Sequence, residues 1–177
     1  IRGAVNIGRL FSDIQRQGYQ KTFDDLGIEY QGKSAKEICS GLVNYISASA
    51  DSKEDSVARI AAVNAMSKMY EYMENNNLEL QSLDKVDNVL MEQVLSKYVE
   101  CYIWGRILND LQYCLEKYSN DIDRTMKVEQ EMKDYVSSKV RTTFQIKEIR
   151  DKIFGHNSIE DGIETLYEKC YSVLEDM

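Results

Sequence analysis

The clearest structural pattern in the chain is Ser34-Ala-Lys-Glu-Ile-Cys-Ser-Gly-Leu-Val-Asn-Tyr-Ile46. A serine followed three residues later by a glutamate forms a capping box, in which the two side chains satisfy free backbone amides at a helix start. Apolar residues then recur at helical spacing, at Ile38, Leu42, Val43 and Ile46. This stretch therefore predicts an amphipathic helix that begins at Ser34 and runs to about Ser47.

Other segments on both sides of this helix have the same periodicity. Apolar residues are spaced for helices in residues 4–14, 57–73, 86–115, 122–136 and 159–174, and a shorter segment ends at Gly155. The 177 residues include no proline and only nine glycines, so few helix breakers are available. Residues 140–146 alone have a strand-like composition, and we expect them to continue a helix.

The sequence therefore predicts an all-α fold of about seven or eight helices in a single multihelical domain, residues 1–177. One long central helix is expected over about residues 83–118. Gly105 lies within it, and the segment is either one helix, kinked there, or two helices that meet there, because glycine inside a helix costs about 1 kcal/mol relative to alanine. We favour one helix.

Composition argues against several classes of protein. With 22 basic and 30 acidic residues the net charge is −8, which works against binding to nucleic-acid phosphates. The four cysteines are far apart and form no C-x-x-C pair, so we expect no metal site, no redox motif and no cofactor, and a reducing cytoplasm fits best. No apolar stretch approaches the roughly 20 residues that span a membrane.

Few residues are suited to catalysis. His156 is the only histidine, and the sequence has no glycine-rich phosphate-binding loop. Arg150, Asp151 and His156 do resemble the R-x(4–6)-H motif of HEPN ribonucleases, in which the histidine would transfer protons and the arginine would stabilise phosphate. The alternative is a helix end near Gly155 with a histidine beside terminal carbonyls. We favour that alternative and predict that the chain is not an enzyme.

Aromatic residues gather in the central segment, at Tyr98, Tyr102, Trp104 and Tyr113. Tyrosine and tryptophan dominate the energetics of protein interfaces, so these side chains could form a partner-binding surface. Packing in the core is the alternative and the more common role.

Three stretches carry a family resemblance: Phe11-Ser-Asp-Ile-Gln-Arg-Gln-Gly-Tyr19, Phe23-Asp-Asp-Leu-Gly-Ile28 and Gly32-Lys-Ser-Ala-Lys-Glu-Ile-Cys-Ser-Gly-Leu-Val43. With residues 55–65, their spacing resembles QatB proteins of the QatABCD antiviral defence operon. The resemblance covers about the first 75 residues well. It marks Gln15, Arg16, Gly18 and Tyr19 as candidate partner-binding residues, although helix termination at Gly18 with a surface arginine is an equally good interpretation.

The resemblance also implies partners and a role. Such operons encode an ATPase, a QueC-like protein and a TatD-like nuclease, so catalysis would lie in these neighbours. A glycine- and serine-rich tail usually precedes the first of these stretches in that family, and we expect such a tail before Ile1. The leading hypothesis is a non-enzymatic scaffold subunit that binds the QueC-like partner and presents this tail for modification. A generic helical adaptor unrelated to defence is the third hypothesis.

Overall fold

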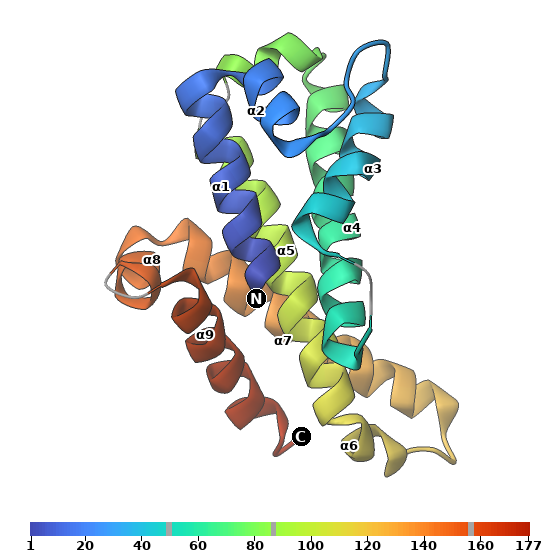
Figure 1. Cartoon of the computed structure of the whole chain (residues 1–177). Coiled ribbons are helices and arrows are strands. Elements are labelled where there is room, and N and C mark those ends of the chain that lie inside the picture. The colour runs from blue at the N-terminus through green and yellow to red at the C-terminus, as the bar shows by residue number, and fades with distance from the viewer. Residues whose placement is uncertain (49–50, 86–87, 156–157) are drawn as a thin grey trace. The chain divides into compact units, whose positions relative to one another are not determined.

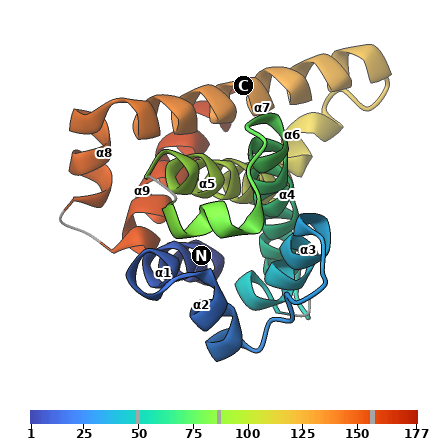
Figure 2. The ribbon, with the colours of Figure 1, turned by 90° about the horizontal axis from the view of Figure 1, so that it is seen from above.

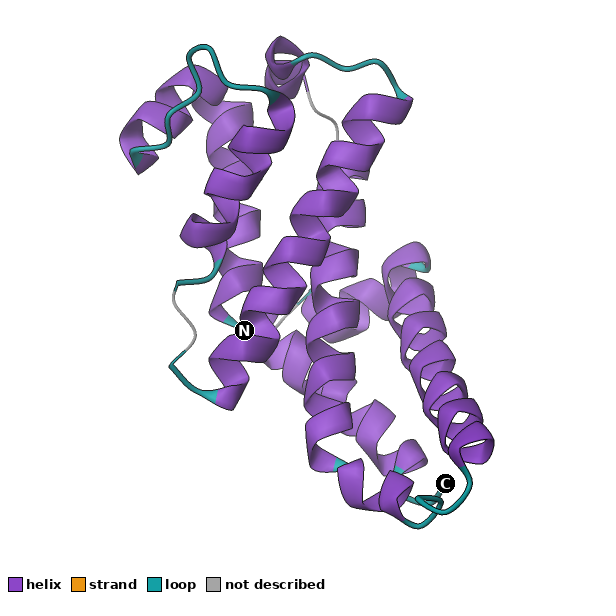
Figure 3. Cartoon of the chain, turned by 90° about the vertical axis from the view of Figure 1, so that its right-hand side faces the viewer, coloured by secondary structure: helices purple, strands orange, loops and turns teal. Residues whose placement is uncertain are grey.

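The computed structural model describes residues 1–48, 51–85, 88–155 and 158–177. Within these ranges it contains nine α-helices and one short 3-10 helix, with no strand (Figure 3). The all-α prediction is confirmed. The chain divides into two compact units, residues 1–98 and 99–177, and each is described separately. The assignment of the whole chain to one domain stays a prediction.

The first unit contains five helical segments and the start of a sixth. They are α1 (Arg2–Gln17), α2 (Tyr19–Leu26), α3 (Ala35–Ile46), α4 (Lys53–Asn75), η1 (Leu80–Lys85) and the first half of α5 (Asn88–Asp110). In this unit α3 lies along α4, and α1 packs against α2 and α3 (Figure 1). Its core is built from apolar faces of these helices, among them Ile7, Leu10, Phe11, Leu42, Ala61, Ala65 and Met69.

Small residues allow close packing in the first unit. Ala61, Ala62 and Ala65 on α4 are fully buried. Gly3 on α1 lies against the ring of Tyr98, and a Cβ added at Gly3 would come within 2.7 Å of the Tyr98 Cζ atom. A side chain at position 3 would therefore force this unit to rearrange.

The second unit contains the rest of α5 with α6 (Gln112–Glu116), α7 (Ile122–Gln145), α8 (Lys147–Phe154) and α9 (Ile159–Leu174). Helix α7 contacts α6, α8 and α9. Ile146 ends α7 and begins α8 with an extended backbone, so the chain turns there without a loop (Figure 2). Val136, Val140, Ile163, Leu166 and Cys170 form its core.

Side-chain capping fixes several helix starts. The predicted capping box is present, because the Glu37 amide donates to Ser34 Oγ at 3.2 Å and the Ser34 amide donates to Glu37 Oε2 at 2.7 Å. Asp121 accepts a hydrogen bond from the Arg124 amide and Ser158 accepts one from the Asp161 amide, so both residues act as N-caps. Each cap satisfies a backbone donor that the helix itself leaves open.

The central helix is shorter than expected. Helix α5 continues through Gly105 without interruption and ends at Asp110, and Leu111 then separates it from α6. Leu111 is buried and apolar, so the apolar periodicity runs on through the break. Residues 140–145 continue α7 as expected. The separate short helices η1 and α6, at the two ends of the expected central helix, raise the number of helices in the described residues above seven or eight.

Candidate functional site

Gly18 forms a sharp elbow between α1 and α2. Its φ of 87° lies in the region that side chains disfavour, so glycine is required there. Its amide donates to the Ile14 carbonyl at 2.9 Å and ends α1. Its carbonyl accepts from the hydroxyl of Thr22 at 2.8 Å and starts α2. One residue thus serves as the C-cap of the first helix and the N-cap of the second.

A distant carboxylate completes this elbow. Asp84 Oδ1, in η1, accepts a hydrogen bond from the Tyr19 amide at 2.7 Å. The bond satisfies an open donor in the first turn of α2 and places negative charge at the positive end of the helix dipole. The elbow is therefore held from both sides, by the backbone of α1 and by η1.

Tyr19 connects the elbow to the loop between α2 and α3. Its buried ring lies edge-on to Phe23 at 5.9 Å and to Tyr30 at 5.8 Å between centroids. The phenol of Tyr30 has a raised pKa, because of desolvation and the nearby Asp24 carboxylate. Gly18 and Tyr19 therefore shape the elbow, and their role in binding a partner stays a prediction.

Gln15 and Arg16 lie on the exposed face of α1 next to this elbow. The Arg16 side chain is 69% exposed and forms an ion pair with Asp13 at 3.1 Å. Gln15 Nε2 donates to Asn88 Oδ1 at 3.3 Å. Of the four residues that the family resemblance marks, these two have the exposure that a contact with a partner requires.

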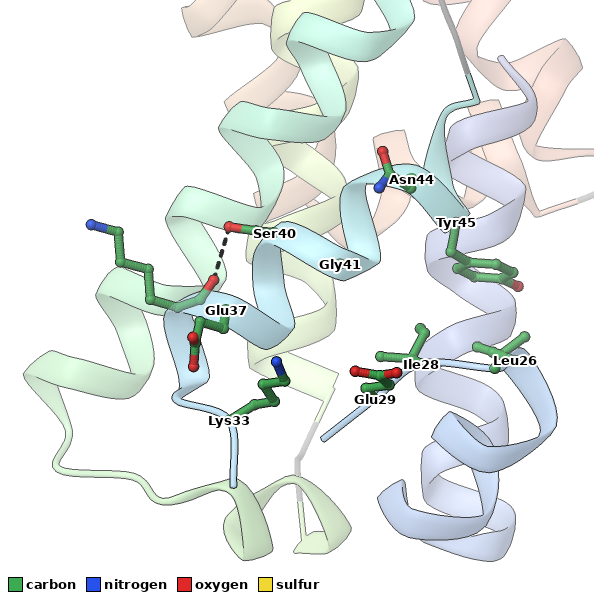
Figure 4. A pocket seen from close by; sticks show the side chains of 11 residues that line it. Leu26, Ile28, Glu29, Lys33, Glu37, Ser40, Gly41, Asn44 and Tyr45 are labelled. Atoms are coloured by element: carbon green, nitrogen blue, oxygen red, sulfur yellow. Dashed lines mark hydrogen bonds between the residues drawn. The ribbon is translucent and has the colours of Figure 1, made fainter. Parts of the chain in front are cut away.

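A groove of about 740 Å³ runs between the α2–α3 loop and α3 (Figure 4). Leu26, Gly27 and Ile28 form one wall, and Gly41, Asn44 and Tyr45 on α3 form the other. The loop that forms the first wall is the one that Tyr19 contacts through Tyr30. The elbow therefore contacts the loop that forms one wall of the groove.

The groove carries charges of both signs. Glu29, Lys33, Lys36 and Glu37 all line it, together with Ser40, whose hydroxyl donates to the Lys36 carbonyl at 3.0 Å (Figure 4). Hydrogen bonding to the Ser34 amide lowers the pKa of the Glu37 carboxyl, so it stays ionised. A mixture of charges beside apolar Leu26 and Ile28 suits a polypeptide segment better than a single small ion.

The aromatic residues of α5 have different surroundings. Tyr98 in the first unit and Tyr102 in the second are fully buried, and Trp104 is half-buried. Burial raises the pKa of the Tyr98 phenol well above its ordinary value. Tyr98 and Tyr102 therefore pack in the cores of their units, which was the alternative to the interface hypothesis. Tyr113, at 54% exposure, is the accessible member of the cluster.

The ribonuclease-like motif falls on α8 and beyond. Asp151 is exposed, and its carbonyl accepts from the Gly155 amide at 2.8 Å at the end of the helix. Arg150 is half-buried, and His156 lies outside the described residues. The structure therefore leaves the role of these three residues as a prediction.

The described residues contain neither a metal-binding cluster nor a membrane-spanning helix. Among the described residues, no group of three or more His, Cys, Asp or Glu side chains could hold a metal ion. No helix in the same residues is long and apolar enough to span a membrane.

The groove, one wall of which is the α2–α3 loop, was not predicted from the sequence. Gly27 and Gly32 frame this loop, and both have positive φ, at 68° and 70°. The sequence feature that could have predicted the groove is the presence of Ile28 and Tyr30, an apolar residue and a tyrosine, in an otherwise polar loop. Such residues in a turn between helices often pack back on the neighbouring helix.

The fold and this surface define an all-helical protein with an open groove, lined by charged and apolar side chains, near a capped helix elbow. The family model described as "Qat anti-phage system associated protein QatB" matches residues 1–174. The chain therefore belongs to the QatB family, as the resemblance indicated, and is associated with an anti-phage system. Comparison with curated proteins found no match, and neither did comparison with solved structures.

Proposed function

We propose that this chain is a non-enzymatic subunit of the Qat anti-phage system that binds a QueC-like partner. The observation that carries the proposal is the family match over residues 1–174. The elbow and groove of the first unit support it, because they combine exposed polar side chains with a preformed apolar wall. The ATPase and the TatD-like nuclease of the same system are further candidate partners.

The proposal includes presentation of the N-terminal region to the partner. Helix α1 begins at Arg2, with Ile1 as its N-cap residue, so a preceding segment would leave the unit directly from α1. Such a segment would be accessible for modification by a QueC-like enzyme. We place the complex in the cytoplasm, and the free thiols of Cys39, Cys114 and Cys170 support a reducing compartment.

The test is co-expression of the full-length protein with the QueC-like protein from the same operon. Affinity capture followed by size-exclusion chromatography with light scattering measures the stoichiometry of any complex. Intact-mass analysis of this chain then detects an added group. We expect one co-eluting species of defined mass.

Separate elution of the two proteins would contradict partner binding. Co-elution without added mass would support binding and contradict modification of this chain. Cleavage of RNA by the chain alone, lost on His156→Ala, would instead support a ribonuclease.

A further inference from the structure

Helix α4 exposes two large apolar side chains one turn apart. Ile60 is 61% exposed and Val63 is 46% exposed, although the opposite face of the same helix is fully buried at Ala61, Ala62 and Ala65. Ser67 and Tyr70 continue the outer stripe at helical spacing, and neither carries a charge at neutral pH. An uncharged stripe on an outer helix face is typical of contact with another helix.

A second groove lies directly beside this stripe, between α3 and α4. It holds about 350 Å³, and its apolar lining is Cys39, Val43, Val63 and Met66. Because Val63 belongs both to the outer stripe and to the groove, the two form one surface, which we call the α3–α4 surface. Its volume suits a few apolar side chains entering from a neighbouring helix.

The charged residues that line this groove are all basic. Lys36 and Arg59 line it, and no carboxylate does, in a chain with 30 acidic and 22 basic residues. The groove between α3 and the α2–α3 loop differs, since Glu29 and Glu37 accompany its lysines. Glu74 accepts from the Tyr70 hydroxyl at 3.2 Å, at one end of the α3–α4 surface, but does not line the groove.

Arg59 is held in position without an ion pair. Its guanidinium donates to the Ser47 carbonyl at 3.0 Å and to Asn44 Oδ1 at 2.9 Å, both neutral acceptors. Within the described residues neither Arg59 nor Lys36 forms a salt bridge. A partner carboxylate would therefore meet positive charge that is already oriented, which lowers the entropic cost of binding.

We infer that the α3–α4 surface binds an amphipathic helix of a partner subunit, with its apolar stripe on Val63 and its acidic residues beside Lys36 and Arg59. The inference rests on the proposed function and adds the surface and the chemistry of the partner. Charge complementarity favours an acidic helix as the occupant, because the lining offers two cations and no anion. A second copy of this chain is the occupant to be distinguished.

The experiment measures binding of the QueC-like subunit to the full-length chain by biolayer interferometry. The test variant is Ile60→Glu with Val63→Glu, at exposed positions where glutamate leaves the fold intact. The matched control is Ile122→Glu with Met126→Glu, because those residues are also exposed, at 73% and 64%, one turn apart on α7. We expect the test variant to weaken binding by about tenfold or more and the control to leave it unchanged.

Charge is tested with Lys36→Glu, at an exposed residue whose substitution leaves the buried face of α3 intact. We expect slower association, by roughly fivefold at low salt, with a difference that shrinks as salt screens the charges. Circular dichroism of each variant confirms its fold.

The outcomes separate the two proposals. Failure of the wild-type chain to bind would contradict the proposed function. Equal binding by wild type and the Ile60 and Val63 variant would overturn only the α3–α4 surface. A wild-type dimer in light scattering that this variant converts to monomer would show that a second copy occupies the surface, which would also overturn the inference.

Discussion

Each of the two units is stabilised internally by a different kind of contact. In the first unit, helices approach closely at small residues, as where Gly3 meets the ring of Tyr98. In the second unit, α5 and α9 are joined by charged and polar side chains. Arg106 donates two hydrogen bonds to Glu164 at 2.7 and 3.2 Å, and its guanidinium carbon lies 3.8 Å from the centre of the Tyr167 ring.

Two polar contacts join α5 and α9 in the second unit. Besides the Arg106–Glu164 pair, Tyr167 on α9 donates a hydrogen bond to Asp110 on α5. The hydrogen bonds to Glu164 raise the pKa of Arg106 although burial opposes this, and burial together with Asp110 raises the pKa of Tyr167. The two units should therefore be sensitive to different substitutions. Larger side chains at the close helix contacts should destabilise the first unit, and removal of a charged side chain should destabilise the second.

The largest expected effect is that of Gly3→Ala. The new methyl group would overlap the Tyr98 ring, so we expect a loss of about 2–3 kcal/mol in the free energy of unfolding. Urea denaturation followed by circular dichroism measures it. The matched control is Gly41→Ala, whose added Cβ would meet only Ile28, at 3.9 Å.

That control should be neutral or should stabilise α3 by up to about 1 kcal/mol, because alanine favours helix. Equal stability of the two variants would contradict the close packing of the first unit.

Arg106→Met tests the second unit. Removal of two charge-assisted hydrogen bonds and a cation–π contact should destabilise it by about 1–2 kcal/mol. The control is Lys21→Met, which breaks an exposed ion pair with Asp25 and should change stability by less than about 0.5 kcal/mol. Hydrogen exchange over α9 should increase in the first variant only. An unchanged exchange rate in α9 would mean that apolar packing alone holds this unit.

The first unit also contains a polar contact between helices, the hydrogen bond from the Tyr19 amide to Asp84. Asp84→Ala tests this contact and should have a smaller effect than the two substitutions above. The substitution removes the acceptor for the Tyr19 amide, so we expect a loss of about 1 kcal/mol. Amide exchange in α2 should rise, and Asp84→Asn, which keeps a side-chain oxygen, should restore most of the protection. Rapid exchange in both variants would show that charge rather than hydrogen bonding matters.

Buried thiols should behave alike in the two units. Burial raises the pKa of Cys39 in the first unit and of Cys170 in the second to about 11, against about 8.5 for a free thiol. Above pH 8.5 the unfolded chain loses these protons before the folded chain does. The contribution of these thiols to stability should therefore be constant below that pH and fall as the pH rises toward 11.

Urea denaturation between pH 7 and 10.5 measures this dependence, with Cys39→Ala and Cys170→Ala as the variants that should reduce it. Near pH 7 the thiols are protonated in both the folded and the unfolded chain, so the free energy of unfolding should not change with pH on their account. A curve that stays flat to pH 10.5 would contradict the burial of both thiols.

Much of the secondary structure could be predicted from the sequence, because helix starts and apolar stripes are local signals. The capping box at Ser34 and the caps at Asp121 and Ser158 are examples. The break at Leu111 could not be predicted, since its apolar side chain continues the helical pattern and only tertiary packing ends the helix.

The candidate site was less predictable, because its parts depend on contacts between distant segments. The family resemblance pointed to Gly18 and Tyr19, but the carboxylate that caps the Tyr19 amide belongs to Asp84, 65 residues further along the chain. Tyr98 and Trp104 are six residues apart on the same helix, yet Tyr98 is buried and Trp104 is half-buried. Residue type alone does not separate a core aromatic from a surface one.

The bond between Asp84 and Tyr19 also bears on how the chain is made. During synthesis α1 and the residues of α2 leave the ribosome long before Asp84 does. Until then α2 is a short helix without its cap, and isolated helices of that length are marginal in water. The elbow that shapes the candidate site should therefore form late in translation, so a nascent chain that stalls before η1 would lack the completed elbow.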